Sequence, residues 1–237
     1  VTYCTEAPPG MRQPFLREHT KRNDFMVEQT LEQFANYPQE FNEFLDWFID
    51  LPLFLEFDHF RVVHACWDQA MIDEYIARYG GNQLTRDMLP ESINTDSFIY
   101  RFLDRMLRGT SLKLPDGRTM TAKDGMKRQF FRTKFWADQP ERYNEVVFQP
   151  DPIPEDLQHA LLSEDEKKQL LYYGPEEKPL FIGHYWMAGL PAPIVPNIAC
   201  IDYSAVKYGR LVAYRMDTEH ALQKSKFTWV RVEKSER

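Results

Sequence analysis

The sequence has few cysteines, no long apolar run and no excess of positive charge, and each absence excludes a class of protein. Its three cysteines, Cys4, Cys66 and Cys200, are scattered without a CxxC pair, which argues against a disulfide framework and for an intracellular, cytoplasmic protein. No apolar stretch approaches the roughly 20 residues that a membrane-spanning helix needs. The net charge of −7 argues against general nucleic-acid binding.

Common catalytic motifs are missing as well. The chain contains no GxSxG elbow, no P-loop and no GxGxxG, and no cysteine stands beside a clear base. A hydrolase that uses a side-chain nucleophile therefore has no motif in its favour. What the sequence does contain is 237 residues that are 43% hydrophobic and 27% charged, a composition typical of a soluble globular protein that can bury a core.

Strand-like segments stand on both sides of a long, mainly helical segment. The helical spacing of apolar residues predicts helices between residues 15 and 50, with Pro38 in a first turn and Pro52 as the stop. Short apolar runs predict two strands within 53–67 and further strands after residue 179. The sequence therefore predicts an α+β protein with these parts: an N-terminal loop and helices at 1–52, strand-bearing segments at 53–68 and 180–237, and a mainly helical insertion or cap at 69–179.

Local signals inside the insertion predict its finer structure. A helix that ends at Gly109 is expected to have Thr95 or Asp96 as its N-cap. The stretch "SLKLPDGRTM" predicts a β-hairpin with its turn at 115–117, and "SEDEKKQLLYYG" predicts a short capped helix. A solvated basic face is the favoured interpretation of the next group, although its arginines suit phosphate binding: Lys127, Arg128, Arg132 and Lys134.

Two of the six histidines stand in a context that suits a metal ligand. His64 in "VVHACW" and His184 in "FIGHYW" each follow a short apolar run, whereas the other four stand among charged residues or in a turn. A neutral imidazole offers a lone pair to a metal ion near pH 7, but a single buried histidine is more often a hydrogen-bonded core residue. Two ligands also fall short of the three protein ligands of a catalytic zinc site. Asp68 and Asp202 would add carboxylates, although a helix N-cap and a turn carboxylate bonded to backbone amides are their favoured roles.

Three segments, "RVVHACWD", "FIGHYW" and "NIACIDYSAVKYGRLVAYRMD", resemble the C-terminal part of the calcineurin-like metallophosphoesterases. The resemblance is to the branch of the phosphoprotein phosphatases and the symmetrical bis-nucleosyl tetraphosphatases, and it covers residues 53–68 and 180–217. It implies that His64 and His184 ligate one ion of a dinuclear centre of divalent transition metals, either manganese, iron or zinc. It also implies an α/β/β/α-type sandwich in which metal-activated water hydrolyses a phosphate ester or phosphoanhydride.

The sequence departs from this family in what it lacks. The D-x-H, GD-x-x-DRG and GNHE motifs, which supply the remaining ligands and the general-acid histidine, are absent, and in the family they precede the matching region. By the resemblance, the sandwich is incomplete at the N-terminus, no catalytic residue lies within this chain, and the chain alone is inactive. Cys66 also stands where many members have glycine.

The resemblance also sets the expected partners. They are a phosphorylated small molecule, a dinucleotide or a phosphoprotein as substrate, with no membrane and no general nucleic-acid binding. A homodimer is expected as well, because strand edges left open by the missing half invite association. Tyr185 and Trp186 are expected to pack a pocket wall. Two alternatives stay open: a non-catalytic binding module on the same scaffold, and an unrelated α+β domain of unknown function in which both histidines are structural.

Overall fold

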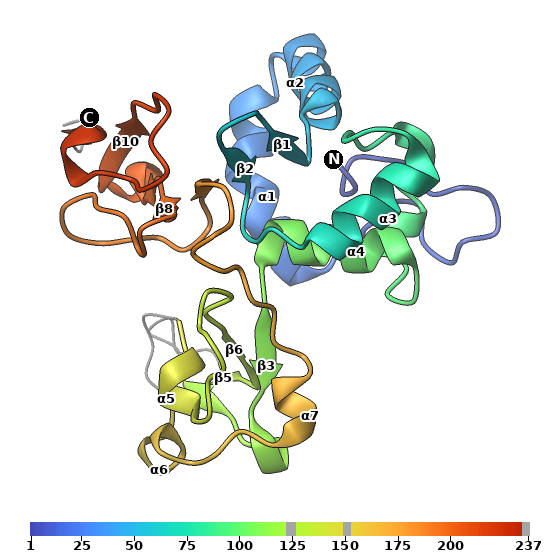
Figure 1. Ribbon diagram of the computed structural model, residues 1–237. Coiled ribbons are helices and arrows are strands. Elements are labelled where there is room, and N and C mark those ends of the chain that lie inside the picture. Colours follow the sequence, from blue (N-terminus) through green and yellow to red (C-terminus); the bar gives the residue numbers. More distant parts are fainter. Residues whose placement is uncertain (122–126, 149–152, 234–237) are drawn as a thin grey trace. The chain divides into compact units, whose positions relative to one another are not determined.

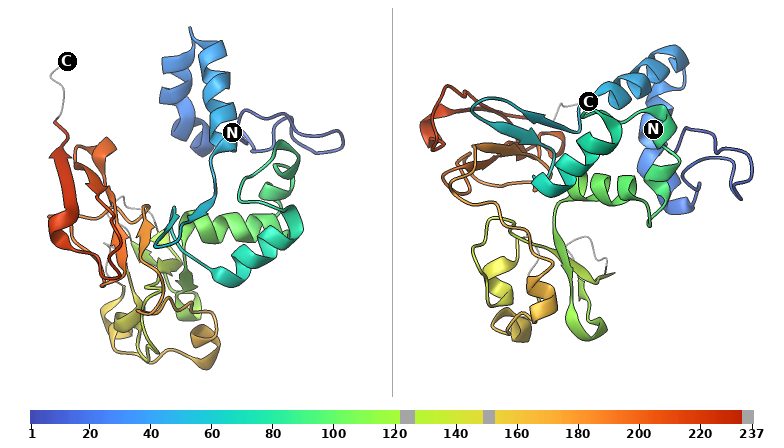
Figure 2. Two further views of the ribbon diagram at one scale, coloured as in Figure 1. Left: turned by 45° about the horizontal axis from the view of Figure 1, so that its top comes forward. Right: turned by 45° about the vertical axis from the view of Figure 1, so that its right-hand side comes forward.

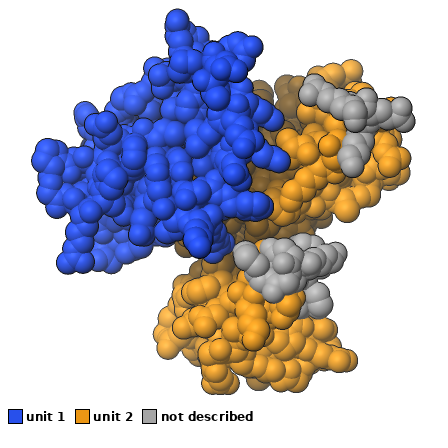
Figure 3. Space-filling view, turned by 180° about the vertical axis from the view of Figure 1, so that it is seen from behind, with its two compact units in different colours: residues 1–53, 71–103 blue, residues 54–70, 104–237 orange. Residues whose placement is uncertain are grey.

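In a computed structural model, residues 1–121, 127–148 and 153–233 are described, and they form a mixed α+β protein with seven α-helices and several small sheets (Figure 1). The predicted α+β class is confirmed at this level. The chain divides into two compact units, residues 1–53 with 71–103 and residues 54–70 with 104–237 (Figure 3). No helix in the described ranges is both long and apolar enough to cross a bilayer.

The first unit is helical and has a small core. Pro38 begins the second helix, and that helix ends before Pro52, as the sequence predicts. A buried cluster of Leu16, Ile49 and Leu89 holds the second helix against the loops of this unit. The helices are α1 (Lys21–Phe34), α2 (Pro38–Asp50), most of α3 (Gln69–Tyr79) and the first part of α4 (Phe98–Arg108).

The N-cap of α4 differs from the prediction. The hydroxyl of Ser97, and not Thr95 or Asp96, accepts a hydrogen bond from the backbone N–H of Tyr100 at 3.0 Å. The backbone N–H of Asp96 is bonded to the Asn94 side chain, which forms a turn just before the helix and leaves Ser97 as the first capping position. A pattern of several adjacent Ser, Thr, Asn and Asp residues does not by itself select which one caps.

The central sheet of the second unit joins two distant segments of the chain. Its β1 and β2 form the predicted antiparallel hairpin, whereas β2, β7 and β8 run parallel to one another. Both β7 and β8 are buried along their whole length, as expected for parallel strands covered on two faces. The strand order is β1 (Phe54–Glu56), β2 (Arg61–Val63), β7 (Leu180–Ile182) and β8 (Ile198–Cys200).

A second sheet forms from the C-terminal strands, in the order β11 (Phe227–Arg231), β10 (Arg210–Tyr214) and β9 (Asp202–Tyr203). Both of its pairings are antiparallel, and β11 confirms the predicted last edge strand. The predicted single strand "IACIDYS" divides at Ile201, so that β8 and β9 belong to different sheets. The rings of Phe181 on β7 and Tyr214 on β10 lie 5.1 Å apart, which gives the two sheets a shared core.

The segment between α4 and β7 builds a third cluster of elements around its own buried residues, among them Leu112, Phe131 and Tyr143. The predicted hairpin within 111–120 is wrong, because residues 115–117 form a 3-10 turn and β3 finds its partner in β6. Ser163 caps α7 in the predicted capping box. The elements are β3 (Ser111–Lys113), β4 (Met120–Thr121), β5 (Lys127–Arg128), β6 (Phe130–Arg132), α5 (Tyr143–Val146), α6 (Glu155–Gln158) and α7 (Glu164–Lys167).

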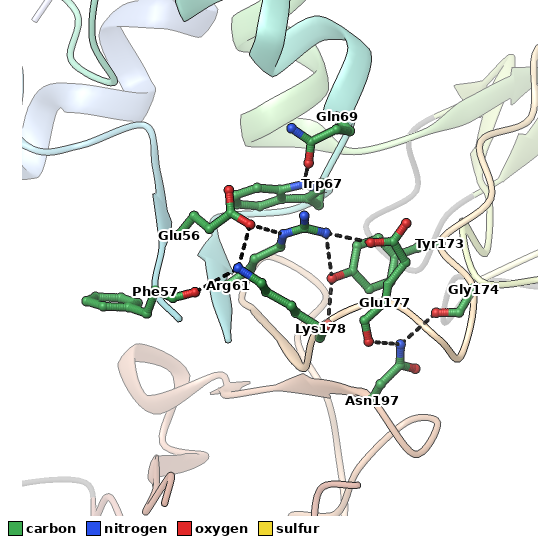
Figure 4. A network of polar contacts seen from close by, with 10 residues as sticks. All are labelled: Glu56, Phe57, Arg61, Trp67, Gln69, Tyr173, Gly174, Glu177, Lys178 and Asn197. Atoms are coloured by element: carbon green, nitrogen blue, oxygen red, sulfur yellow. Dashed lines mark hydrogen bonds and ion pairs between the residues drawn. The ribbon is translucent and has the colours of Figure 1, made fainter. Parts of the chain in front are cut away.

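A polar network around Arg61 fastens β2 to the chain that enters β7 (Figure 4). The Arg61 guanidinium donates to Glu56 at 3.0 Å and to Glu177 at 2.7 Å, and it lies 4.8 Å from the centre of the Trp67 ring. The side chain of Arg61 is only 11% exposed. Because two carboxylates compensate a charge that burial would otherwise leave unpaired, the network stabilises the parallel pairing of β2 with β7.

Arg61→Met is expected to lower the free energy of unfolding by about 2 kcal/mol, because it leaves two carboxylates without their shared cation and removes the stacking on Trp67. The matched control is Lys178→Met, which removes a more exposed cation from Glu56 and is expected to cost less than about 1 kcal/mol. Chemical denaturation followed by circular dichroism measures both. Equal losses in the two variants would contradict a special role for Arg61.

Candidate functional site

Three polar side chains lie just beyond the ends of three adjacent parallel strands. His64 follows β2 directly, His184 comes two residues after β7, and Asp202 comes two residues after β8. Because β2, β7 and β8 run parallel in this order, their carboxyl ends meet at one edge of the sheet. In open sheets of this kind, ligands bind outside the carboxyl ends of the strands. This edge of the central sheet is therefore the candidate functional site.

The two histidines predicted as metal ligands lie side by side at this edge. Their ring centroids are 5.4 Å apart, with an angle of 56° between the ring planes. The backbone N–H of Gly183 donates to the carbonyl of His64 at 2.8 Å, which continues the β2–β7 pairing up to the site. The prediction that distant segments bring this pair together holds in the geometry. Whether the pair binds metal stays a prediction.

The backbone at this edge is strained at several residues. His184 and Trp186 have φ angles of 66° and 49°, and Ser204 and Tyr208 after β9 have φ angles of 58° and 60°. Residues other than glycine are strained in this left-handed region, and strained residues cluster at functional sites.

Asp202 takes the role favoured from the sequence, and the capping role of Asp68 stays a prediction. The Asp202 carboxylate accepts a hydrogen bond from the backbone N–H of Ser204 at 3.0 Å, which confirms a turn carboxylate bonded to a backbone amide. Asp68 directly precedes α3, where an N-cap residue stands, and its carboxylate lies 3.5 Å from the Arg105 guanidinium. Asp202 nevertheless acts on the histidines, because its negative charge opposes the lowering of both imidazole pKa values.

The surroundings keep both imidazoles neutral. Burial is the main cause that lowers the pKa of His64. Burial also lowers the pKa of His184, to about 4, with further contributions from the Arg132 guanidinium, from His64 and from Arg108. A neutral imidazole is the form that binds a metal ion, since the protonated ring has no free lone pair.

Within the described part of the chain, the pair stands without a further side chain that would complete a metal site. There, no group of three or more histidine, cysteine, aspartate or glutamate side chains stands close enough to hold an ion. His64 and His184 fit a metal in two respects, their adjacency and their neutral state. They do not suffice for a closed site, because a catalytic zinc centre has three protein ligands and a dinuclear centre has more.

Arg132 is the residue at this site that the sequence interpretation undervalued. A solvated basic face was the favoured prediction, yet Arg132 is half-buried, and its guanidinium carbon lies 5.9 Å from the centre of the Tyr185 ring. Burial lowers its pKa as well. A signal for this was present, since Arg132 directly follows two phenylalanines in the strand-like stretch "QFFR". Arg108, at the end of α4, was missed, because nothing in its helical context marks it.

The two aromatic residues after His184 behave differently from each other. Tyr185 is 5% exposed and packs against Trp136 and Phe148, and its predicted place in a pocket wall stays a prediction. Trp186 is instead 54% exposed, and the Lys207 ammonium lies 3.8 Å from its ring centre, so its part in a pocket wall stays a prediction.

The Tyr185 hydroxyl is buried and, within the described residues, has no hydrogen-bond partner. It presses against Gly109, where an added Cβ atom would lie 2.6 Å from the hydroxyl oxygen. Gly109 also has a φ of 80°. Only a residue without a side chain satisfies both the conformation and the contact, so Gly109 connects the end of α4 to the wall beside His184.

Comparisons with known proteins leave the family of this chain open. No protein-family model matches it, no curated protein matches it, and no solved structure matches it. The function is therefore inferred from the side chains at the edge of the central sheet and from their geometry.

Gly109→Ala is expected to lower the free energy of unfolding by more than about 2 kcal/mol, because left-handed strain and the collision with Tyr185 act together. Gly117→Ala is the matched control: Gly117 has a φ of 68° with no atom within 4 Å of the added Cβ, so strain alone is expected to cost about 1 kcal/mol. Thermal and chemical denaturation measure both changes.

Tyr185→Phe deletes the unpartnered hydroxyl and is expected to be neutral or stabilising by about 1 kcal/mol. Combined with Gly109→Ala, it should recover part of the loss, which a double-mutant cycle detects. If the double variant is as unstable as the sum of the single variants, the hydroxyl does not cause the collision.

Proposed function

We propose that this protein is a metal-dependent phosphoesterase and that the chain supplies the His64–His184 pair of its metal centre. One observation carries the proposal: two imidazoles stand side by side at the carboxyl ends of adjacent parallel strands, with ring centroids 5.4 Å apart. The motif order "VHAC", "GHYW" and "DYSAVKYGRLVA" supports the same conclusion by resemblance. The remaining ligands of the family come from motifs that these 237 residues do not contain.

The two sheets of the second unit support the sandwich part of the proposal. The central sheet and the β11–β10–β9 sheet share a buried core in which Phe181, Ala199 and Leu222 pack together. Partly buried Tyr214 and Phe227 join this core from the second sheet. Face-to-face packing of two sheets, with polar groups at the strand ends, is the arrangement that an α/β/β/α metallophosphoesterase requires.

Each group at the site would have a defined role in phosphoester hydrolysis. A divalent manganese, iron or zinc ion held by the two imidazoles would supply Lewis acidity, lowering the pKa of water and neutralising phosphate charge. Asp202 orients the loop after β8 through its bond to Ser204 and moderates the positive field. The guanidiniums of Arg132 and Arg108 each add positive potential at His184, which favours an anionic substrate. Phosphate esters of small molecules, dinucleotides and phosphoproteins all carry the required anion.

A second candidate is a binding module on the same scaffold without turnover. It is favoured by the absence of a third ligand group among the described residues. The alternative of an unrelated α+β domain treats both histidines as structural. The three readings differ in metal content and in activity, so one set of measurements separates them.

The test uses the complete product of the gene, purified and loaded with Mn²⁺, with p-nitrophenyl phosphate as the substrate. We expect hydrolysis that disappears with a chelator and returns with Mn²⁺. His64→Ala and His184→Ala are each expected to lower kcat/KM by on the order of 100-fold or more, while the melting temperature stays near that of the unaltered protein. The matched control is His159→Ala, at an exposed position, which should leave activity unchanged.

The other outcomes are equally clear. No stoichiometric metal and no hydrolysis would favour the binding module. Loss of folding stability in His64→Ala and His184→Ala without any change in metal content would favour structural histidines. Hydrolysis that persists after both substitutions would remove this pair from the active site.

Arg132→Met is expected to raise KM for p-nitrophenyl phosphate and the inhibition constant of inorganic phosphate by about tenfold, because it removes a half-buried cation beside His184. Arg132→Lys keeps the charge without the forked geometry and should show an intermediate effect. Lys134→Met is the control for the loss of a nearby positive charge. Equal effects of Arg132→Met and Lys134→Met would show that only the net charge matters.

A further inference from the structure

The last strand of the chain forms an open edge of the second sheet. Its sheet has the order β11–β10–β9, and β11 has no neighbour on its other side among the described residues (Figure 2). The edge strand, "FTWVR", contains no proline, glycine or bulge, and it pairs with β10 along all five of its residues. Proteins usually protect such an edge with one of these devices, because unpaired N–H and C=O groups attract another strand.

The hydrogen bonds at the two ends of β11 show which residues face outward. Val232 donates its N–H to Gly209 at 3.0 Å, and Lys226 accepts from the N–H of Arg215 at 3.0 Å. In an antiparallel pair, residues alternate between those bonded to the partner strand and those that are not. The even-numbered residues of β11 therefore bond to β10, and Phe227, Trp229 and Arg231 present their backbone groups to the open side.

Most of those outward groups are available for pairing. The N–H of Phe227 donates to Lys224 at the end of a 3-10 turn. Within the described ranges, no hydrogen bond occupies the carbonyl of Phe227 or either backbone group of Trp229 or Arg231. The side chains beside this edge are apolar and exposed: Trp229 is 41% exposed, Val230 59% and Leu211 63%.

We propose that two copies of this chain associate through β11, antiparallel to each other, with Trp229 opposite the second copy's Trp229. In this register the two tryptophans exchange both N–H···O bonds, and Arg231 donates its N–H to the free carbonyl of Phe227 in the second copy. Each three-stranded sheet then continues into the other. The contact is isologous, so it closes after two copies.

The side chains of "FTWVR" are complementary to themselves in this register. Phe227 lies opposite the second copy's Arg231, a pairing of an aromatic ring with a guanidinium, and Thr228 lies opposite Val230. A shift of four residues toward the C-terminus would instead set the two Arg231 side chains opposite each other, where like charges repel. Within one chain, Arg231 already lies opposite Arg210, so a further cation at this position would be unfavourable, while an aromatic neighbour is favourable. Self-complementarity of this kind selects a second copy as the partner.

The interface is small, since each copy contributes one short strand. An association of this size is expected to be weak and concentration-dependent rather than obligate. It leaves the edge of the central sheet with His64 and His184 untouched, and its tests measure association and not activity.

Two cysteine variants of the 237-residue chain test the register directly. Thr228→Cys in one sample and Val230→Cys in another, both with Cys4→Ser, are mixed in equal amounts and oxidised. Non-hydrogen-bonded antiparallel neighbours lie close enough for a disulfide, whereas Thr228 and the second copy's Thr228 are diagonal. We expect about tenfold more cross-linked dimer in the mixture than in either variant alone. An equal yield in all three samples would overturn the register.

Sedimentation equilibrium with a second pair of variants tests the interface. Arg231→Pro removes an outward N–H without taking a bond from β10, and we expect it to raise the dimer dissociation constant by at least about tenfold. Arg231→Ala, which keeps the N–H, should have a smaller effect. Trp47→Ala alters an exposed aromatic residue of α2 and should have none. A monomer at every concentration, or a dimer that responds to Trp47→Ala and not to Arg231→Pro, would overturn the proposal.

Discussion

The parallel pairing of β2 with β7 is the constraint on which the candidate site depends. The pairing sets Arg61 beside Leu180 and Val62 beside Phe181, and it continues through the hydrogen bond from Gly183 to the carbonyl of His64. The long segment between β2 and β7 must close into a loop for the two strands to pair. Closing it costs conformational entropy that local contacts do not offset. The Arg61 network offsets part of that cost where β2 and β7 begin, because a nearly buried guanidinium there binds carboxylates from both segments. Without the pairing, His64 and His184 would not be held side by side.

The sequence reveals the local elements better than their partners. Proline positions, capping residues and short apolar runs place α2, α7, β1, β2 and β11 correctly, because each depends on a few neighbouring residues. The hairpin predicted within 111–120 failed for the opposite reason. Its turn signal is real and forms a 3-10 turn, but the partner of β3 is chosen by packing, since Leu112 and Phe131 pair across β3 and β6 and are buried together. The division of "IACIDYS" between two sheets is likewise a tertiary event that no local pattern records.

The candidate site shows the same limit in its chemistry. His64 and His184 are recognisable because each ends an apolar run, and the favoured roles of Asp68 and Asp202 follow from their positions. The contact between Gly109 and the Tyr185 hydroxyl joins residues from distant segments, so no periodicity predicts it. Arg132 is similar, because its half-buried state follows from the packing of β6 beside the tyrosine. The left-handed conformation of Trp186 is also invisible in the sequence, since tryptophan does not favour that region.

At the proposed metal centre, electrostatic interactions couple the binding of the metal ion to the binding of a phosphate group. Burial and the guanidiniums of Arg132 and Arg108 disfavour a proton on His184, and the same positive charges oppose a lone divalent cation on that imidazole. A phosphate group bound beside Arg132 would cancel much of this repulsion while gaining an attraction to the metal. Metal and anionic substrate should therefore each raise the affinity for the other, and by linkage the two effects are equal. Asp202 offsets part of this repulsion, because its negative charge acts on both imidazoles. Under the proposed function, the site binds the metal ion and the anionic substrate together more tightly than it binds either one alone.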